Sequence, residues 1–284
     1  MCTVVLAGLR KLDKLGFNRP MWTRRLTAVL GLAVLALVAH AAPANAIANG
    51  EEVPIGQYRF SVKLTMTGIP TADGGRRNSA CSGSLIAPQW VLTAGHCFRD
   101  ANGVRVDRPV ADLTTATVGR TDLGGTGGHV VTVVAVRQSP TNDVALARID
   151  KWIADIRPLR LSHTAPEVGD VLRLTGYGSI TSQNPTPSTR LRTGQLQLTT
   201  VNAATLGMTG YAPQRNTTPC PYDSGGPFFS ERHPGGPTVV AVVSSGPSCP
   251  HVLDETTARI DVIVPWIKDV IGPRVLTSSG QTFP

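Results

Sequence analysis

The sequence predicts an all-β protein, and three observations favour this fold class. Its 284 residues are 41% hydrophobic and 16% charged, which is the composition of a globular domain and not of a disordered chain. Its 29 Gly and 22 Pro follow no period and divide the chain into many short segments. Several segments alternate apolar and polar residues with a period of two, as half-buried strands do. A turn-rich sequence of this kind suits antiparallel sheets better than packed helices.

The first 46 residues are predicted to be a signal peptide. Arg24-Arg25 precede an apolar run from Leu26 to Ala39, and Ala44-Asn45-Ala46 follows as a small-residue cleavage site. The run is about 14 residues long, whereas a bilayer span needs about 20, so no membrane attachment is expected after cleavage. Met21 is an alternative start, because its own Trp-Thr-Arg-Arg continuation already supplies the charged region. The Sec and Tat export routes both remain open.

The charge of the mature chain excludes a nucleic-acid-binding protein. The net charge is +8, but the first 46 residues hold six basic residues and one acid, so subtraction leaves about +3. The remaining Arg residues are dispersed and form no basic footprint. We expect protein or peptide partners and a monomeric chain.

The cysteines indicate an oxidising compartment. Five are present, and cleavage after residue 46 removes Cys2. The other four can form two disulfides in a secreted, extracellular protein, with three possible connectivities. No two of them are spaced as C-x2-C, so no metal site is expected.

Strands and one helix are predicted along the mature chain. Residues 60–66, 130–136 and 191–198 alternate with a period of two and predict strands, and Gly-rich breakers separate such segments. Residues 262–271 predict the one helix, which Gly272-Pro273 would end. The residues after this point are polar enough for a tail.

Three short motifs carry the residue types that acyl transfer needs. They are Leu92–Cys97, which contains His96, Asn142–Ala147, which contains Asp143, and Cys220–Pro227, which contains Ser224. A serine hydroxyl attacks an amide only when a base takes its proton, and that imidazole needs a carboxylate to fix its tautomer. Glycines beside the serine let backbone N–H groups approach the scissile carbonyl.

Taken in the order His, Asp, Ser, these motifs resemble the chymotrypsin/trypsin family of serine proteases, from residue 47 to about residue 267. An α/β-hydrolase has the order Ser, Asp, His instead. The resemblance implies His96 as general base, Asp143 as its orienting carboxylate and Ser224 as nucleophile. Because Arg outnumbers Lys, as in many high-GC bacterial genomes, we expect a bacterial, secreted member.

The resemblance also implies the architecture. Two six-stranded antiparallel β-barrels, at about 47–155 and 156–270, are expected to pack face to face with the three catalytic residues at their junction. A short C-terminal helix and a tail would complete a protease domain over 47–284.

Further site residues follow from the same resemblance. The implied disulfides are Cys81–Cys97 and Cys220–Cys249. The segment Ser244, Ser245 and Gly246 would bind substrate backbone as an added strand. Signal cleavage would free the amine of Ile47, which is expected to pair with the Asp223 carboxylate and tolerate no preceding residue.

Two positions depart from the family pattern. Tyr222 stands where the family has a glycine whose N–H, together with that of Ser224, forms the oxyanion hole, and a side chain there restricts the backbone. Thr218 stands at the base of the specificity pocket, where trypsin-like members have Asp. Thr218 favours a small to medium, polar or apolar substrate side chain, but Asp254 or Glu255 at the pocket wall leaves a basic preference open.

The sequence therefore predicts a secreted serine endopeptidase that needs no cofactor and works through an acyl-enzyme on Ser224. A calcium site is possible in the family but has no signature here. One alternative is a catalytically impaired homologue, disabled at Tyr222, that acts as a secreted binding protein. An esterase on the same fold is the other.

Overall fold

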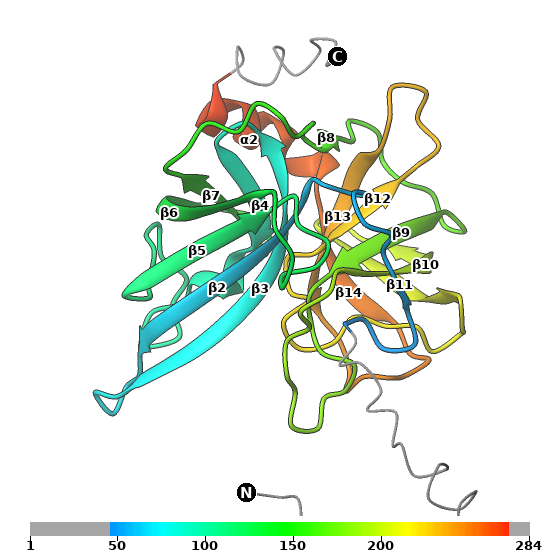
Figure 1. Ribbon diagram of the computed structural model, residues 1–284. Coiled ribbons are helices and arrows are strands. Elements are labelled where there is room, and N and C mark those ends of the chain that lie inside the picture. Colours follow the sequence, from blue (N-terminus) through cyan, green and yellow to red (C-terminus); the bar gives the residue numbers. More distant parts are fainter. Residues whose placement is uncertain (1–45, 273–284) are drawn as a thin grey trace, which may run out of the picture. The chain divides into compact units, whose positions relative to one another are not determined.

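A computed structural model describes residues 46–272 (Figure 1). The predicted signal peptide, except for Ala46, and the predicted tail lie outside the described residues. Within the described range the regular secondary structure is almost entirely strand, with two 3-10 turns and one short α-helix. No helix in residues 46–272 is long and apolar enough to cross a membrane.

The first barrel is a closed antiparallel sheet in the order β2-β3-β4-β7-β6-β5. Its strands are β2 (Ser61–Pro70), β3 (Arg76–Ala87), β4 (Trp90–Ala94), β5 (Leu113–Val118), β6 (His129–Gln138) and β7 (Val144–Ile149). A 3-10 turn, η1 (Gly95–Phe98), follows β4 directly. The strands predicted at 60–66 and 130–136 are confirmed as parts of β2 and β6.

The second barrel closes as the ring β9-β10-β11-β14-β13-β12. Its strands are β9 (Val171–Gly176), β10 (Arg192–Val201), β11 (Thr205–Ala212), β12 (Pro227–Ser230), β13 (Thr238–Ser245) and β14 (Glu255–Arg259). Two short strands join its sheet, β1 (Glu51–Glu52) beside β10 and β8 (Arg160–Leu161) parallel to β13. Two six-stranded barrels were predicted, and the structure confirms them.

The C-terminal helix is also confirmed. A 3-10 turn, η2 (Asp261–Ile263), leads into α2 (Val264–Ile271), with a proline in the first turn, where its missing N–H costs nothing. Gly272 ends the helix at φ 88°. Val264, Ile267 and Ile271 lie on one face and are buried, so the helix packs through an apolar stripe of helical spacing.

The apolar core has three main parts, one inside each barrel and one between them. Val62, Leu64 and Phe98 belong to the core of the first barrel, and Leu174 and Met208 to that of the second. The third part lies between the barrels and combines residues of both with the helix, namely Leu92, Leu146, Phe229, Val242 and Ile267. Strands at this junction are buried on both faces and so lose the simple alternation of a half-exposed strand.

Strand β2 shows the effect of the junction on polar side chains. Ser61 and Lys63 alternate with Val62 and Leu64, yet both are buried. Ser61 Oγ forms a hydrogen bond with Thr175 Oγ1 of the second barrel at 2.9 Å. The outward face of β2 is therefore covered by the other barrel and not by water.

The two predicted disulfides are present. Cys81 is bonded to Cys97, and Cys220 to Cys249. The first holds η1 against β3 and the second joins the serine segment to the loop after β13, so each bridge stays within one barrel.

Opening a bridge should destabilise the domain. We expect Cys81→Ala/Cys97→Ala to lower the free energy of unfolding by roughly 2–4 kcal/mol, because the unfolded chain regains the entropy of an open loop. Cys220→Ala/Cys249→Ala, whose loop spans 29 residues against 16, should cost at least as much. Urea unfolding of both variants measures the loss, and wild-type stability in either would contradict the assignment.

Candidate active site

His96 lies in η1, immediately after the strand that brings it to the junction of the barrels. The Asp143 carboxylate contacts it twice: His96 Nδ1 lies 2.7 Å from Oδ2, and the His96 backbone N–H donates to Oδ1 at 2.8 Å. An ionised carboxylate only accepts hydrogen bonds, so Nδ1 carries the ring proton. This leaves His96 Nε2 as a basic nitrogen.

Asp143 precedes β7, whose pairing with β4 brings it to His96. Ser244 Oγ also donates to Asp143 Oδ2, at 2.7 Å. Burial alone would raise the pKa of this carboxyl, but the hydrogen bonds and charge of His96, together with the Ser244 hydroxyl, lower it to about 2. Asp143 is therefore ionised at neutral pH and suited to stabilise an imidazolium.

Arg105 is a neighbour of this pair that the sequence did not indicate. Its Nη1 lies 3.7 Å from Asp143 Oδ1 and donates to Asn142 O at 2.7 Å. With His96 and Ser244 it lines a cleft of about 490 Å³. Arg105 belongs to an irregular loop between η1 and β5, where no spacing links it to a motif.

Ser224 lies on a turn pressed against the end of β4. Gly225 has φ 80°, and a Cβ there would be 2.5 Å from Ala94 N and closer still to Thr93 Oγ1. The Ser82 N–H of the first barrel donates to Ser224 O at 2.9 Å. A glycine at position 225 thus allows the turn that carries Ser224 to contact the end of β4, which precedes His96.

Ser224 lines a pocket of about 250 Å³ that shares Ser244 and Ser245 with the cleft containing His96 and Asp143. Within residues 46–272, no hydrogen bond joins Ser224 to His96. In enzymes without bound substrate, catalytic hydrogen bonds are often long or poorly aligned, and they shorten when substrate binds. The structure therefore places the three predicted residues at two adjoining cavities, with the His96–Asp143 bond already formed.

The predicted oxyanion donors are available. Within the described part of the chain, neither the Tyr222 N–H nor the Ser224 N–H donates to a protein acceptor. Tyr222 has φ 76°, in the left-handed region that side chains rarely adopt, at a cost of order 1–3 kcal/mol. Its carbonyl accepts from Ser82 Oγ at 3.1 Å and its hydroxyl donates to Pro185 O at 3.4 Å.

Asp223 is fully buried behind this turn. Its Oδ2 accepts from the Cys220 N–H at 3.0 Å and its Oδ1 from the Gly178 N–H at 2.7 Å. The backbone N–H of Ile47, itself fully buried, lies near the same carboxylate and lowers its pKa. Burial raises the pKa of Asp223 to about 7 in spite of these donors. The two members of the predicted activation pair are thus in contact.

The pocket beside Ser224 is not lined as expected for the specificity pocket. Thr218 is fully buried, pairs through its backbone with Ala48 and is not among the pocket-lining residues. Glu255 does line the pocket, whereas Asp254 Oδ2 accepts from Thr199 Oγ1 on the surface at 2.6 Å. Ser245 and Gly246 form the edge beside Glu255.

Glu255 is held by His251. The His251 Nε2 lies 2.7 Å from Glu255 Oε1, and its Nδ1 accepts from the Leu253 N–H at 3.1 Å. Nε2 is therefore the protonated nitrogen, and a neutral imidazole donates to the carboxyl. Burial and the nearby Asp223 raise the pKa of Glu255 to about 8, so this acid gains its charge only as the pH rises through that value.

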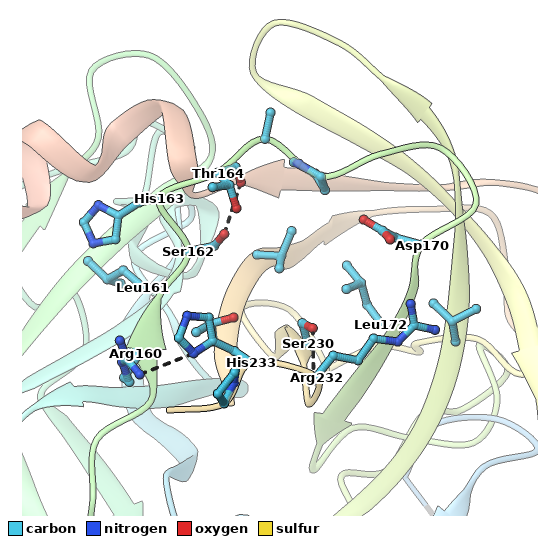
Figure 2. Close-up of a pocket in the computed structure, with 16 residues that line it drawn as sticks. Arg160, Leu161, Ser162, His163, Thr164, Asp170, Leu172, Ser230, Arg232 and His233 are labelled. Atoms are coloured by element: carbon cyan, nitrogen blue, oxygen red, sulfur yellow. Dashed lines mark hydrogen bonds between the residues drawn. The ribbon is translucent and has the colours of Figure 1, made fainter. Parts of the chain in front are cut away.

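A separate cavity of about 430 Å³ is lined in part by β8, and Figure 2 shows its lining side chains. Arg160, His163, Arg232 and His233 border it, and Arg160 Nη1 lies 3.5 Å from His233 Nδ1. None of the three predicted catalytic residues lines this cavity. The candidate site is therefore the cleft and pocket around Ser224.

Comparisons with known proteins agree with this geometry. The sequence profile of a family described as "Trypsin" matches residues 47–267. "Trypsin, alkaline B" of Manduca sexta is 29% identical over 274 residues, covering 87% of this chain and 99% of that protein. "Trypsin 5G1" of Aedes aegypti is 26% identical over 259 residues, covering 80% of this chain and 85% of that protein.

The solved structure of neuropsin, described as a serine protease expressed in the limbic system of mouse brain, shows the same fold. The TM-score is 0.62 at 18% identity, covering 79% of this chain and all of neuropsin. Other matched relatives come from insects and snakes, so the comparisons do not support the bacterial origin expected from the arginine content. The match over residues 47–267 shows that this chain belongs to the trypsin family.

Proposed function

We propose that the chain is a secreted serine endopeptidase that cleaves peptide bonds through an acyl-enzyme on Ser224. The observation that carries this proposal is the hydrogen-bonded His96–Asp143 pair beside a serine whose turn offers two unpaired N–H groups. Membership of the trypsin family supports a peptidase. The two disulfides support an oxidising, extracellular location.

The proposed reaction has two halves, formation of the acyl-enzyme and its hydrolysis, and each group acts once in each half. The Ser224 hydroxyl attacks the scissile carbonyl carbon while His96 Nε2 takes its proton, and Asp143 stabilises the imidazolium. The oxyanion accepts from the N–H groups of Tyr222 and Ser224. As the C–N bond breaks, His96 returns the proton to the leaving amine. Water then attacks the ester in the same way and releases the acid and Ser224.

Substrate would bind as an extended strand along Ser244, Ser245 and Gly246, at the end of β13. The Ser244 side chain has a second role in this scheme, because its hydroxyl also holds Asp143. Export would end at Ala46 and leave Ile47 as the new terminus, already next to Asp223. The proposal needs no cofactor and treats the enzyme as a monomer acting on proteins or peptides.

A catalytically impaired binding protein is the competing function, and the left-handed backbone of Tyr222 is the observation in its favour. An esterase on the same fold is a second competing function. A fluorophosphonate probe separates an active from an impaired site, because it reacts with an activated serine. We expect stoichiometric labelling at Ser224 and steady cleavage of internal bonds in a peptide library. Labelling without peptide cleavage would favour the esterase, and no labelling would favour the binding protein.

The catalytic residues should act as one unit. We expect Ser224→Ala and His96→Ala each to remove nearly all turnover, and the double variant to lose little more. Asp143→Asn should lose roughly 10⁴ in kcat, the loss reported for chymotrypsin-type enzymes, because it favours the wrong imidazole tautomer. Active-site kinetics measure these losses, with thermal unfolding as the control for folding. Undiminished amidase activity in Ser224→Ala would refute the assignment of the nucleophile.

Tyr222→Gly tests whether backbone strain in the oxyanion turn, the turn of Tyr222 to Ser224 that carries the two N–H donors, limits turnover. Glycine adopts φ 76° freely, so kcat should rise, by up to about tenfold if ~1.4 kcal/mol of strain is relieved, with KM nearly unchanged. Tyr222→Ala is the matched control, because it removes the ring but keeps a Cβ in the left-handed region. Equal or lower turnover in the glycine variant would show that the tyrosine backbone already fits.

Glu255 is proposed to select a basic substrate side chain. Because the carboxyl ionises as the pH rises through about 8, kcat/KM for Arg or Lys substrates, relative to matched Gln or Leu substrates, should increase between pH 6.5 and 9. In Glu255→Gln this ratio should be low and independent of pH. Asp254→Asn is the control and should behave as the wild type. A pH-independent ratio in the wild type would eliminate Glu255 as the selecting charge.

A further inference from the structure

Lys63 is a buried cation that the proposed mechanism does not use. It lies on β2, and only 5% of its surface is exposed. Its Nζ donates to Tyr177 O at 2.9 Å. Within residues 46–272 this carbonyl is its only hydrogen-bond acceptor, and it forms no direct ion pair with a carboxylate. Burying an ammonium with so few partners is costly, so a favourable charge must lie nearby.

One peptide group connects Lys63 to Asp223. The carbonyl of this group belongs to Tyr177 and accepts from Lys63, while its N–H belongs to Gly178 and donates to Asp223 Oδ1 at 2.7 Å. The cation, the peptide and the carboxylate are therefore connected in series, and each hydrogen bond polarises the next. A Cβ on Gly178 would lie 2.6 Å from Asp223 Oδ1, so the residue must be glycine for the peptide to approach this closely.

The electrostatics of the two groups agree with this connection. Burial lowers the pKa of Lys63 to about 8, and the Asp223 charge opposes this shift. Burial raises the pKa of Asp223 to about 7, and its N–H donors and the Lys63 charge oppose that shift. Each group thus favours the charged form of the other inside the protein.

Lys63 also lies next to Tyr222, one of the two residues that depart from the family pattern. Its Nζ is 6.0 Å from the ring centroid of Tyr222 and 5.9 Å from that of Tyr177. Both distances suit a cation–π interaction, which is strengthened when the cation is buried. Lys63 is therefore connected to the oxyanion turn on two sides, through Asp223 and through the Tyr222 ring.

We propose that Lys63 is a positioning residue that supplies the counter-charge of Asp223 through the Tyr177–Gly178 peptide and so holds the oxyanion turn without a free Ile47 amine. In a chain that still carries residue 46, the nitrogen of Ile47 is a neutral amide and brings no positive charge to Asp223. The turn is nevertheless formed, with the N–H groups of Tyr222 and Ser224 unpaired. The inference rests on the proposed function. It departs from the expectation that Ile47 tolerates no preceding residue, because it predicts that activity does not depend entirely on the new terminus.

The groups that face Lys63 and influence its charge come from several segments of the second barrel. Asp223 is the carboxylate, and it in turn raises the pKa of Glu255. Tyr177 and Tyr222 contribute their rings, and in the mature chain the Ile47 amine would add a second cation near Asp223. A chain with one additional residue before Ile47 lacks that second cation, so it isolates the effect of Lys63.

The test compares the authentic chain, which begins at Ile47, with an extended chain, which carries one additional Ala before Ile47. Each chain is made with Lys63 and with Lys63→Met. Methionine keeps the length of the side chain and removes its charge. We expect the extended wild type to retain activity within roughly tenfold of the authentic chain. Lys63→Met should cost the extended chain at least about 100-fold in kcat/KM and in labelling rate, because a buried carboxylate loses its cation. The authentic chain should lose less than about tenfold.

Two further measurements distinguish positioning from a packing effect. In the extended wild type, kcat/KM should fall as the pH rises through about 8, where Lys63 loses its charge. Lys63→Arg should restore activity to the extended chain if it folds, because it restores the cation. Lys151→Met, which removes an exposed lysine, should change nothing, and thermal unfolding monitors folding of every variant.

Failure of this inference is distinguishable from failure of the proposed function. If the authentic wild type neither reacts with the probe nor cleaves peptides, the proposed function is wrong and the role of Lys63 falls with it. If the authentic chain is active while the extended wild type is inactive, only the role of Lys63 is refuted. The same holds if Lys63→Met reduces both chains equally. The extended wild type and its pH profile test the inference even if every Lys63 variant fails to fold.

Discussion

The candidate site depends on the burial of one carboxylate, that of Asp223. This side chain has no access to water, so its oxygens must be satisfied by protein groups. The backbone N–H groups of Gly178, from the loop after β9, and of Cys220, from the same turn, donate to them, and the nearby N–H of Ile47 lowers the pKa of the carboxyl. These contacts hold the carboxylate and, with it, the backbone of the turn that carries Ser224.

The junction of the barrels fixes the second half of the site. Ser82 of the first barrel bonds the serine turn twice, from its N–H to Ser224 O and from its hydroxyl to Tyr222 O. Its hydroxyl also accepts the Tyr177 N–H, and its carbonyl accepts from Thr93 Oγ1. The same residue thus connects the strand that ends before the histidine with the turn that carries the nucleophile. These bonds hold the two barrels together at the point where the predicted catalytic groups meet.

Much of this arrangement could be predicted from local patterns. Periodicity identified β2, β6 and β10, and the apolar spacing of residues 262–271 identified the helix. The His96–Asp143 pair and both disulfides followed from the resemblance of three short motifs to the chymotrypsin/trypsin family, because the cysteines by themselves left three pairings open. Local patterns suffice for the strands and the helix, where neighbouring residues in the sequence decide the structure.

The remaining features depend on contacts between distant segments. Alternation places Lys63 opposite Val62 and Leu64, which predicts exposure, but the second barrel covers that face of β2. The choice between Asp254 and Glu255 required the register of β14, which pairs Glu255 with Met208 across the second barrel. Arg105 reaches Asp143 from a loop with no regular spacing. None of these contacts is encoded within a single stretch of sequence.

A crystal structure of the mature chain after reaction with a peptidyl phosphonate tests the central claim most directly. The phosphonyl group on Ser224 imitates the tetrahedral intermediate and carries an oxygen in place of the oxyanion. The account predicts that this oxygen lies about 2.7–3.1 Å from the backbone nitrogens of both Tyr222 and Ser224, with Asp223 still buried behind the turn. An oxygen directed away from these N–H groups, or a turn that rearranges when Ser224 is modified, would contradict it.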